Sequence, residues 1–97
     1  MKITYSPRAL ADLASIADYL TERNPEAAIA VELRIREAVD RLAEFPGMGR
    51  ALAQRPAVRV MPLGRYPYIL FYTAADDELI VLHIRHGSRK PPESDEF

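Results

Sequence analysis

The sequence predicts an α+β fold of the order β-α-α-β-β-β, in which a helical hairpin packs on one face of a mostly antiparallel sheet. Two stretches of helical apolar spacing follow one short alternating segment, and three strand-like segments fill the second half of the chain. With 97 residues, 48% hydrophobic and 28% charged, the composition is typical of one globular domain. We expect this domain to cover residues 1–90, followed by an acidic tail at residues 91–97.

The N-terminal quarter predicts a strand and then a helix. Residues 2–6, KITYS, alternate between polar and apolar side chains, which is typical of a short half-buried strand. The pair Ser6-Pro7 then starts a helix, since serine is a favoured N-cap and proline suits the first turn. Apolar residues at helical spacing continue this helix up to the pair Asn24-Pro25, which repeats the same capping pattern.

A second helix is predicted from Pro25 to about Glu44. Its apolar residues gather on one face that should pack on the sheet, namely Ala28, Val31, Ile35, Ala38, Val39, Leu42 and Phe45. Ile29 and Leu33 lie on the charged side of this helix, four residues apart. They either widen the core stripe or form an exposed apolar strip for a partner.

The FPGMGR segment ends the second helix, because proline cannot continue it and two glycines favour a loop. Three strands are then predicted at residues 57–64, 66–74 and 78–87, with Asp76-Asp77 as the turn of an antiparallel hairpin. The last two strands are apolar on both faces, which indicates central or covered strands. The predicted core joins Leu13, Ile16, Leu20, Val31, Ile35, Val39 and Leu42 of the helices to Ile69, Phe71, Ile80, Leu82 and Ile84 of the strands.

The composition excludes several kinds of site. The absence of cysteine removes disulfides and thiolate metal sites and favours a reducing, cytoplasmic location. The two histidines of the last strand, His83 and His86, should point to opposite faces, so we expect no metal and no cofactor. His83 is expected to be a core or half-buried residue rather than a base, and His86, at the strand end, is the more accessible. No nucleotide-binding, hydrolase or zinc-protease motif occurs, and no apolar segment is long enough for a signal peptide or a membrane span.

The net charge of −1 conceals an uneven distribution. Residues 1–46 carry 6 basic and 8 acidic side chains (net −2), residues 47–90 carry 7 and 3 (net +4), and residues 91–97 carry 3 acids (net −3). Arginines and tyrosines interleave in the basic region, a composition typical of an interface or an RNA-binding face. This region therefore either binds an acidic partner or only solvates an open sheet.

The segments ITYSPRALADLASIADYL, NPEAA, FPGMGR and YPYILFYTAADDELIVLHIRHGSR, in this order and spacing, resemble the ParE/RelE superfamily of toxins from type II toxin–antitoxin modules. The resemblance spans residues 2–90. It implies the same fold, growth inhibition, plasmid stabilisation and a cognate antitoxin, ParD-like or similar, that forms a hetero-oligomer with the toxin. ParE-like members inhibit DNA gyrase and are not nucleases, whereas RelE-like members cut mRNA on the ribosome.

The chain departs from the RelE-like pattern, because no arginine follows Tyr66 in its strand and no tyrosine follows Arg89. We therefore expect a ParE-like gyrase inhibitor without catalytic residues. The alternatives are a RelE-like endoribonuclease and a non-toxic relative. As a ribonuclease, the protein would use His83, Arg85, His86 and Arg89. Target binding is assigned to Arg59, Arg65, Arg85, His86 and Arg89, and antitoxin binding to Ile29, Leu33, Arg36 and Tyr68.

Overall fold

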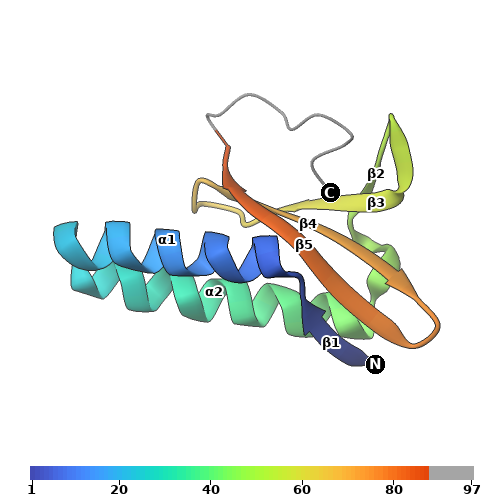
Figure 1. The fold of residues 1–97 in the computed structure, drawn as a ribbon, viewed down its shortest axis with the longest axis horizontal. Coiled ribbons are helices and arrows are strands. Elements are labelled where there is room, and N and C mark those ends of the chain that lie inside the picture. The colour runs from blue at the N-terminus through green and yellow to red at the C-terminus, as the bar shows by residue number, and fades with distance from the viewer. Residues whose placement is uncertain (88–97) are drawn as a thin grey trace.

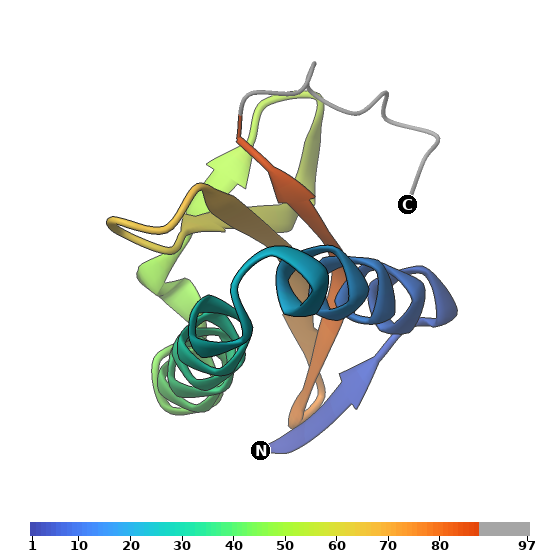
Figure 2. The same ribbon diagram turned by 90° about the vertical axis from the view of Figure 1, so that its left-hand side faces the viewer.

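The computed structural model describes residues 1–87, and it places two helices side by side on one face of a five-stranded sheet (Figure 1, Figure 2). The elements are β1 (Lys2–Tyr5), α1 (Pro7–Arg23), α2 (Pro25–Glu44), the 3-10 helix η1 (Pro46–Met48), β2 (Arg50–Leu52), β3 (Arg55–Pro62), β4 (Tyr68–Ala75) and β5 (Glu78–His86). The predicted α+β architecture is thereby confirmed. Neither α1 nor α2 combines the length and the apolarity that crossing a membrane requires.

The start of each helix follows from a local capping pattern. Ser6 Oγ accepts a hydrogen bond from the Ala9 N–H at 3.1 Å, and Asn24 Oδ1 accepts one from the Ala27 N–H at 3.2 Å. Proline occupies the first turn of both helices, where its missing N–H has no partner to lose. Both helices therefore begin where the sequence predicts.

The strands are arranged in the order β1-β5-β4-β3-β2, with β1 parallel to β5 and every other pair antiparallel. Asp76 and Asp77 form the predicted hairpin turn between β4 and β5, with φ angles of 51° and 67°. The sequence did not predict the short edge strand β2, which the structure adds between the helices and β3 in chain order. Three residues are too few for an alternating pattern to be recognised in a sequence.

The main core lies between the two helices and the sheet. The buried residues of α2 are Val31, Ile35, Ala38, Val39 and Leu42, and the partly buried residues of α1 that pack against this core are Leu13, Ile16 and Leu20. The predicted helix faces are therefore confirmed for these residues. Phe45, which was predicted on the packing face of α2, is instead 56% exposed, because α2 ends at Glu44 and the backbone of Phe45 has left the helical conformation.

The predicted strand part of the main core is wrong for four of its five residues. Ile69, Phe71 and Leu82 belong to a second apolar cluster, which they form with Leu52, Val58 and Val60 away from the main core. Ile80 is half-buried and belongs to neither cluster. The buried strand residues of the main core are Tyr68, Leu70, Tyr72, Leu79, Val81 and Ile84, of which the sequence predicted Ile84.

A β-bulge explains why strict alternation fails along β5. Phe71 pairs with His83 and Tyr72 pairs with Val81, so Leu82 has no opposite residue on β4. An inserted residue of this kind reverses the alternation of side chains between the two faces. Val81 and Ile84, three residues apart, consequently belong to the same core.

Replacing Ile35 by alanine is expected to lower the free energy of unfolding by about 2–5 kcal/mol, because Ile35 is buried in the main core and its truncation leaves a cavity. Ile29→Ala on the exposed side of the same helix is the control, with an expected change within about 0.5 kcal/mol. Chemical denaturation of both variants measures the difference. A loss for Ile35→Ala as small as that of the control would contradict the described helix face.

Candidate functional site

Helix α1 covers the edge of β5 at the point where β1 ends. The Ser6 backbone N–H donates to the Val81 carbonyl and the Ser6 hydroxyl donates to the Leu82 carbonyl, both at 2.9 Å. Further along, the Ile84 N–H donates to Asp12 Oδ2 of α1, also at 2.9 Å. These three hydrogen bonds satisfy backbone groups of β5 that would otherwise pair with a neighbouring strand. Helix α1 is thereby fixed along the second half of β5.

Beside this edge, Arg8, Asp12 and His83 form a polar cluster. Asp12 Oδ2 lies 2.6 Å from His83 Nδ1, while the Arg8 guanidinium lies 3.4 Å from Asp12 Oδ1 and 3.5 Å from His83 Nε2. His83 is 5% exposed, and its ring stacks on Phe71 with 5.6 Å between the centroids. Both ring nitrogens therefore face protein groups. This position agrees with the expectation that His83 is a core residue.

A cleft of about 690 Å³ opens between α1 and the end of β5, and we call it the α1–β5 cleft. The residues that line it are Arg8, Asp12, Ser15, Ile16, Tyr19 and Leu20 of α1 and Pro67, Tyr68, His83, Ile84, Arg85 and His86 of the sheet side. Cationic and imidazole groups thus stand beside aromatic and aliphatic side chains. Such a combination suits a ligand that carries both acidic and apolar groups.

Arg85 and His86, two of the predicted target-binding residues, come together in this cleft. The Arg85 guanidinium donates to the His86 carbonyl at 3.0 Å and lies 5.6 Å from the centroid of the Phe71 ring. The His86 ring meets the Tyr68 ring edge-on, with 5.5 Å between the centroids. Arg89, which the sequence places in the same group, lies outside the described residues.

The two histidines of β5 lie on opposite faces of the strand, as their spacing predicts. His83 stacks on Phe71 of the second cluster, and His86 contacts Tyr68 of the main core. Within residues 1–87, no three His, Cys, Asp or Glu side chains are close enough together to hold a metal ion.

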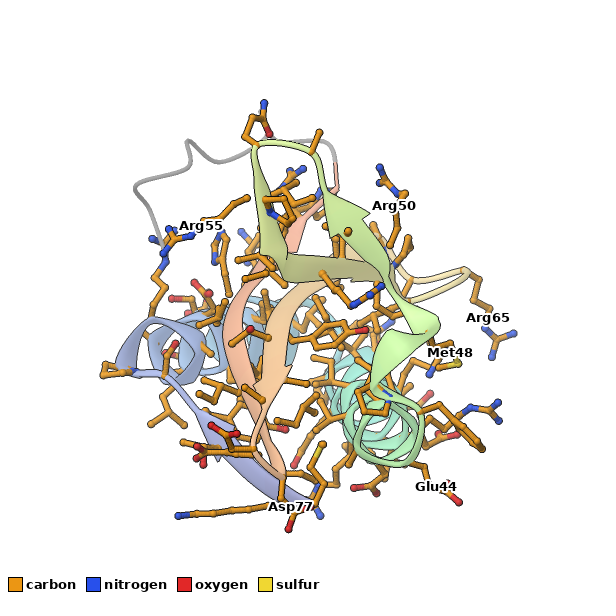
Figure 3. The ribbon with its side chains drawn as sticks, turned by 90° about the vertical axis from the view of Figure 1, so that its right-hand side faces the viewer. Glu44, Met48, Arg50, Arg55, Arg65 and Asp77 are labelled. Atoms are coloured by element: carbon orange, nitrogen blue, oxygen red, sulfur yellow. The ribbon has the colours of Figure 1, made fainter. Side chains whose placement is uncertain are left out.

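Arg59 and Arg65 are not part of the α1–β5 cleft. Arg59 is turned toward the loop after α2, where its Nη1 donates to the Gly49 carbonyl at 2.7 Å and to the Gly47 carbonyl at 3.4 Å. Arg65 extends outward from the β3–β4 turn, as Figure 3 shows, and its guanidinium lies 5.4 Å from the Tyr66 ring centroid. It lines a separate groove against α2. Target binding by these two arginines stays a prediction.

Tyr72 holds the loop after α2 in place. Its hydroxyl accepts a hydrogen bond from the Gly49 N–H at 2.9 Å and donates one to the Pro46 carbonyl at 2.7 Å. Burial raises the pKa of Tyr72, and the Gly49 N–H and Arg59 only partly oppose this effect, so the hydroxyl keeps the proton that it donates. A Cβ at Gly49 would lie 2.5 Å from the Tyr72 hydroxyl oxygen and 3.0 Å from the Val60 carbonyl oxygen, which explains the glycine.

Tyr72→Phe is expected to lower the free energy of unfolding by about 1–3 kcal/mol, because it leaves the Gly49 N–H and the Pro46 carbonyl without their buried partner. Tyr19→Phe is the matched control, since Tyr19 is 53% exposed and the change at an exposed site should stay within about 0.5 kcal/mol. Urea titration of the two variants gives both values. Equal stability of the two variants would show that the Tyr72 hydroxyl does not hold the loop.

Ile29, Leu33 and Arg36 form an exposed row on α2, which we call the α2 strip. Ile29 is 62% exposed and Leu33 is 54% exposed, so the exposed strip is the correct one of the two predicted alternatives. The Arg36 guanidinium lies 3.4 Å from the Glu32 carboxylate on the same helix. Tyr68 is 6% exposed and belongs to the α1–β5 cleft, not to the α2 strip. The role of all four predicted residues in antitoxin binding stays a prediction.

Sequence reasoning missed Arg8, Asp12 and Tyr19, the polar and aromatic residues on the α1 wall of the cleft. Their spacing of four and seven residues marks one helix face, and this was the available signal. Nothing local indicates that this face meets the end of β5, because Asp12 and His83 are 71 residues apart in the chain.

The chain is similar to known toxins over nearly its whole length. The family described as "ParE toxin of type II toxin-antitoxin system, parDE" matches residues 3–91. "Toxin RelE2" of Caulobacter vibrioides is 39% identical over 89 residues, which cover 91% of this chain and 97% of that protein. "Toxin RelE3" of the same organism is 31% identical over 86 residues, which cover 88% of this chain and 92% of that protein.

A solved structure has the same fold. The structure titled "Chromosomal ParDE TA system from P. aeruginosa" superposes with a TM-score of 0.75 at 27% identity, covering 89% of this chain and 95% of that chain. Fold, family match and relatives therefore agree, and a toxin of this kind has a cognate antitoxin as its partner. The chain belongs to the ParE/RelE family of toxins from type II toxin–antitoxin systems.

Proposed function

We propose that this toxin acts by binding its target rather than by catalysis, and that the target is DNA gyrase. The observation that carries the proposal is the state of His83, whose two ring nitrogens face Asp12 and Arg8 in a site that is 5% exposed. A general base must reach the proton that it removes, and a ribonuclease needs such a base together with a group that stabilises the phosphate. Gyrase as the target follows from the resemblance to ParE-like members.

Target binding is assigned to the end of β5, where Arg85 and His86 line the α1–β5 cleft. Arginine beside aromatic side chains is the composition of binding hot spots. Arg89 continues this group in the sequence, and Arg59 and Arg65 are further candidates on other parts of the surface. The toxin acts in the cytoplasm under this proposal, and growth inhibition and plasmid stabilisation are its expected consequences.

The antitoxin is proposed to bind the α2 strip, because Ile29 and Leu33 expose large apolar side chains on an otherwise charged helix flank. Leu33 also lines the groove of about 440 Å³ between α2 and the β3–β4 turn. A ParD-like segment that lays apolar side chains along this strip would form the expected hetero-oligomer.

A RelE-like endoribonuclease is the second candidate. Three relatives bear the name RelE, and the α1–β5 cleft joins arginine, histidine and tyrosine side chains in the way that RNA-binding surfaces do. In this case His86, Arg85 and Arg89 would act on mRNA, since His83 is enclosed by Asp12 and Arg8.

Two assays on the purified protein separate the candidates. We expect it to raise the amount of linear DNA that gyrase releases from a supercoiled plasmid under denaturing conditions, and to leave mRNA on programmed ribosomes intact. The same protein saturated with its antitoxin is the control in both assays. Ribosome-dependent mRNA cuts without any gyrase effect would reverse the ranking, and inactivity in both assays on a protein that arrests growth would exclude both targets.

A further inference from the structure

We propose that the α1–β5 cleft is the docking site of the chain's own acidic segment, residues 91–97. Docking itself does not depend on the proposed function, since it concerns the free protein. The effect of docking on toxicity does rest on the proposed function, because an occupied cleft would cover Arg85 and His86, two of the residues assigned to target binding.

The charges of the cleft favour an anionic occupant. Arg8 and Arg85 line it, and Arg23 follows Tyr19 by one turn on the same face of α1, with its guanidinium 3.8 Å from the centroid of the Tyr19 ring. The carboxylate of the cleft, Asp12, accepts from the Ile84 N–H and lies against His83 and Arg8. Arg8 is thus paired with Asp12, and the Arg23 guanidinium lies 3.8 Å from the Glu22 carboxylate. Among the lining residues two arginines stand against one carboxylate, which leaves one positive charge that favours an anion.

The segment supplies the complementary chemistry. Residues 91–97 contain three acids and no base, at Glu93, Asp95 and Glu96, and they also contain Phe97. The cleft offers the aromatic ring of Tyr19 and the aliphatic side chains of Ile16 and Leu20 beside its arginines. Carboxylates can therefore meet guanidinium groups while an aromatic ring packs on apolar surface. The acidic segment contains both kinds of group within the five residues 93–97.

The segment is attached at the mouth of the cleft. Gly87 follows the lining residue His86 directly, and its N–H donates to the carbonyl of the lining residue Pro67 at 2.7 Å. Glu93 lies six residues beyond Gly87 in the sequence, a span that an extended chain covers in up to about 20 Å. The α1 wall from Tyr19 back to Arg8 measures about 16 Å at the helical rise. The reach of the segment thus exceeds the length of this wall.

Spin labelling of the full chain tests this docking, and the absence of cysteine in the sequence makes a single label unambiguous. A nitroxide on Ser94→Cys is expected to broaden the amide NMR signals of Ser15, Tyr19 and His86 strongly. The signals of Asp76 and Asp77, at the opposite end of β5, should keep their intensity. A nitroxide on Gln54→Cys, in the exposed turn before β3, is the matched label that should spare the cleft.

Removing the charge of the segment is the decisive variant, because it leaves the sequence of residues 1–87 unchanged. Glu93→Gln with Asp95→Asn and Glu96→Gln should abolish most of the broadening, as should about 1 M salt, where the screening length falls to about 3 Å. Arg8→Gln should reduce it as well, whereas Lys2→Gln on β1 should not. Broadening that is absent, or equal in the charged and neutral segments, would overturn the proposal.

A mixed sample shows whether the segment docks in the cleft of its own chain or in that of another copy. Spin-labelled protein without isotope label is combined with isotope-labelled protein that carries no nitroxide. Unchanged cleft signals in this mixture, together with broadening within the labelled chain, support docking within one molecule. Broadening between the two proteins would overturn it in favour of exchange between copies. Because neither gyrase nor ribosomes are present, the result is independent of the assays that test the proposed function.

Discussion

Replacing both Ile29 and Leu33 by aspartate is expected to weaken antitoxin binding by about 10²–10³-fold while the free toxin stays folded. The two side chains are more than half exposed, so they hold no core together, and burying a carboxylate in an apolar contact is strongly unfavourable. Two central interface residues that each contribute about 2 kcal/mol account for a loss of this size, since about 1.4 kcal/mol corresponds to a tenfold change. Titration calorimetry with the purified antitoxin measures the effect.

The matched control for the α2 strip is Leu10→Asp. Leu10 is 56% exposed on α1, so the same chemical change is placed on the neighbouring helix. Antitoxin binding by this variant should equal that of the unmodified protein, and thermal denaturation should show all variants folded. Unfolding of the Ile29/Leu33 double variant would assign these residues to the core, and unchanged affinity would place the antitoxin elsewhere.

Neither His83→Ala nor His86→Ala is expected to remove toxicity at temperatures where the variants are folded, whereas Arg85→Ala should weaken target binding about tenfold. A binding toxin distributes its energy over several contacts, in which one arginine contributes on the order of 1.4 kcal/mol. An enzyme that loses its general base loses a factor of about 10²–10⁴. Growth arrest after induction and the yield of gyrase–DNA cleavage complex are the two measurements.

Stability has to be followed in the same series, because His83 is buried against Asp12 and its removal leaves part of that contact unsatisfied. His86→Ala serves as the comparison, since His86 is only half-buried. The binding mechanism would be refuted by mRNA cuts on the ribosome that disappear in one folded histidine or arginine variant. That outcome would make the RelE-like activity the function of the chain.

Local signals determined the helices of this protein. The pairs Ser6-Pro7 and Asn24-Pro25 carry a cap and a proline in adjacent positions, and the structure begins a helix at each of them. The apolar spacing of α2 named its buried face correctly, since Ile35 and Val39 lie in the core. Capping and helical periodicity act within a few residues, which is why a sequence displays them.

The same reasoning failed on the strands, where both faces are apolar. Alternation cannot choose a face when polar and apolar side chains do not alternate, and Phe71 consequently belongs to the cluster that the sequence did not predict. The bulge at Leu82 depends on the pairing of β4 with β5 and has no local signature. The edge strand β2 is likewise recognisable only beside β3.

The sequence by itself determined the fold class, the two helices with their buried faces, the opposite orientation of His83 and His86, and the family resemblance. Only the tertiary structure decided which strand residues enter the main core and which groups form the α1–β5 cleft. The physical reason is the distance along the chain over which each contact acts. A cap joins Ser6 to Ala9, whereas the contact of Asp12 with His83 exists only after α1 has packed along the edge of β5.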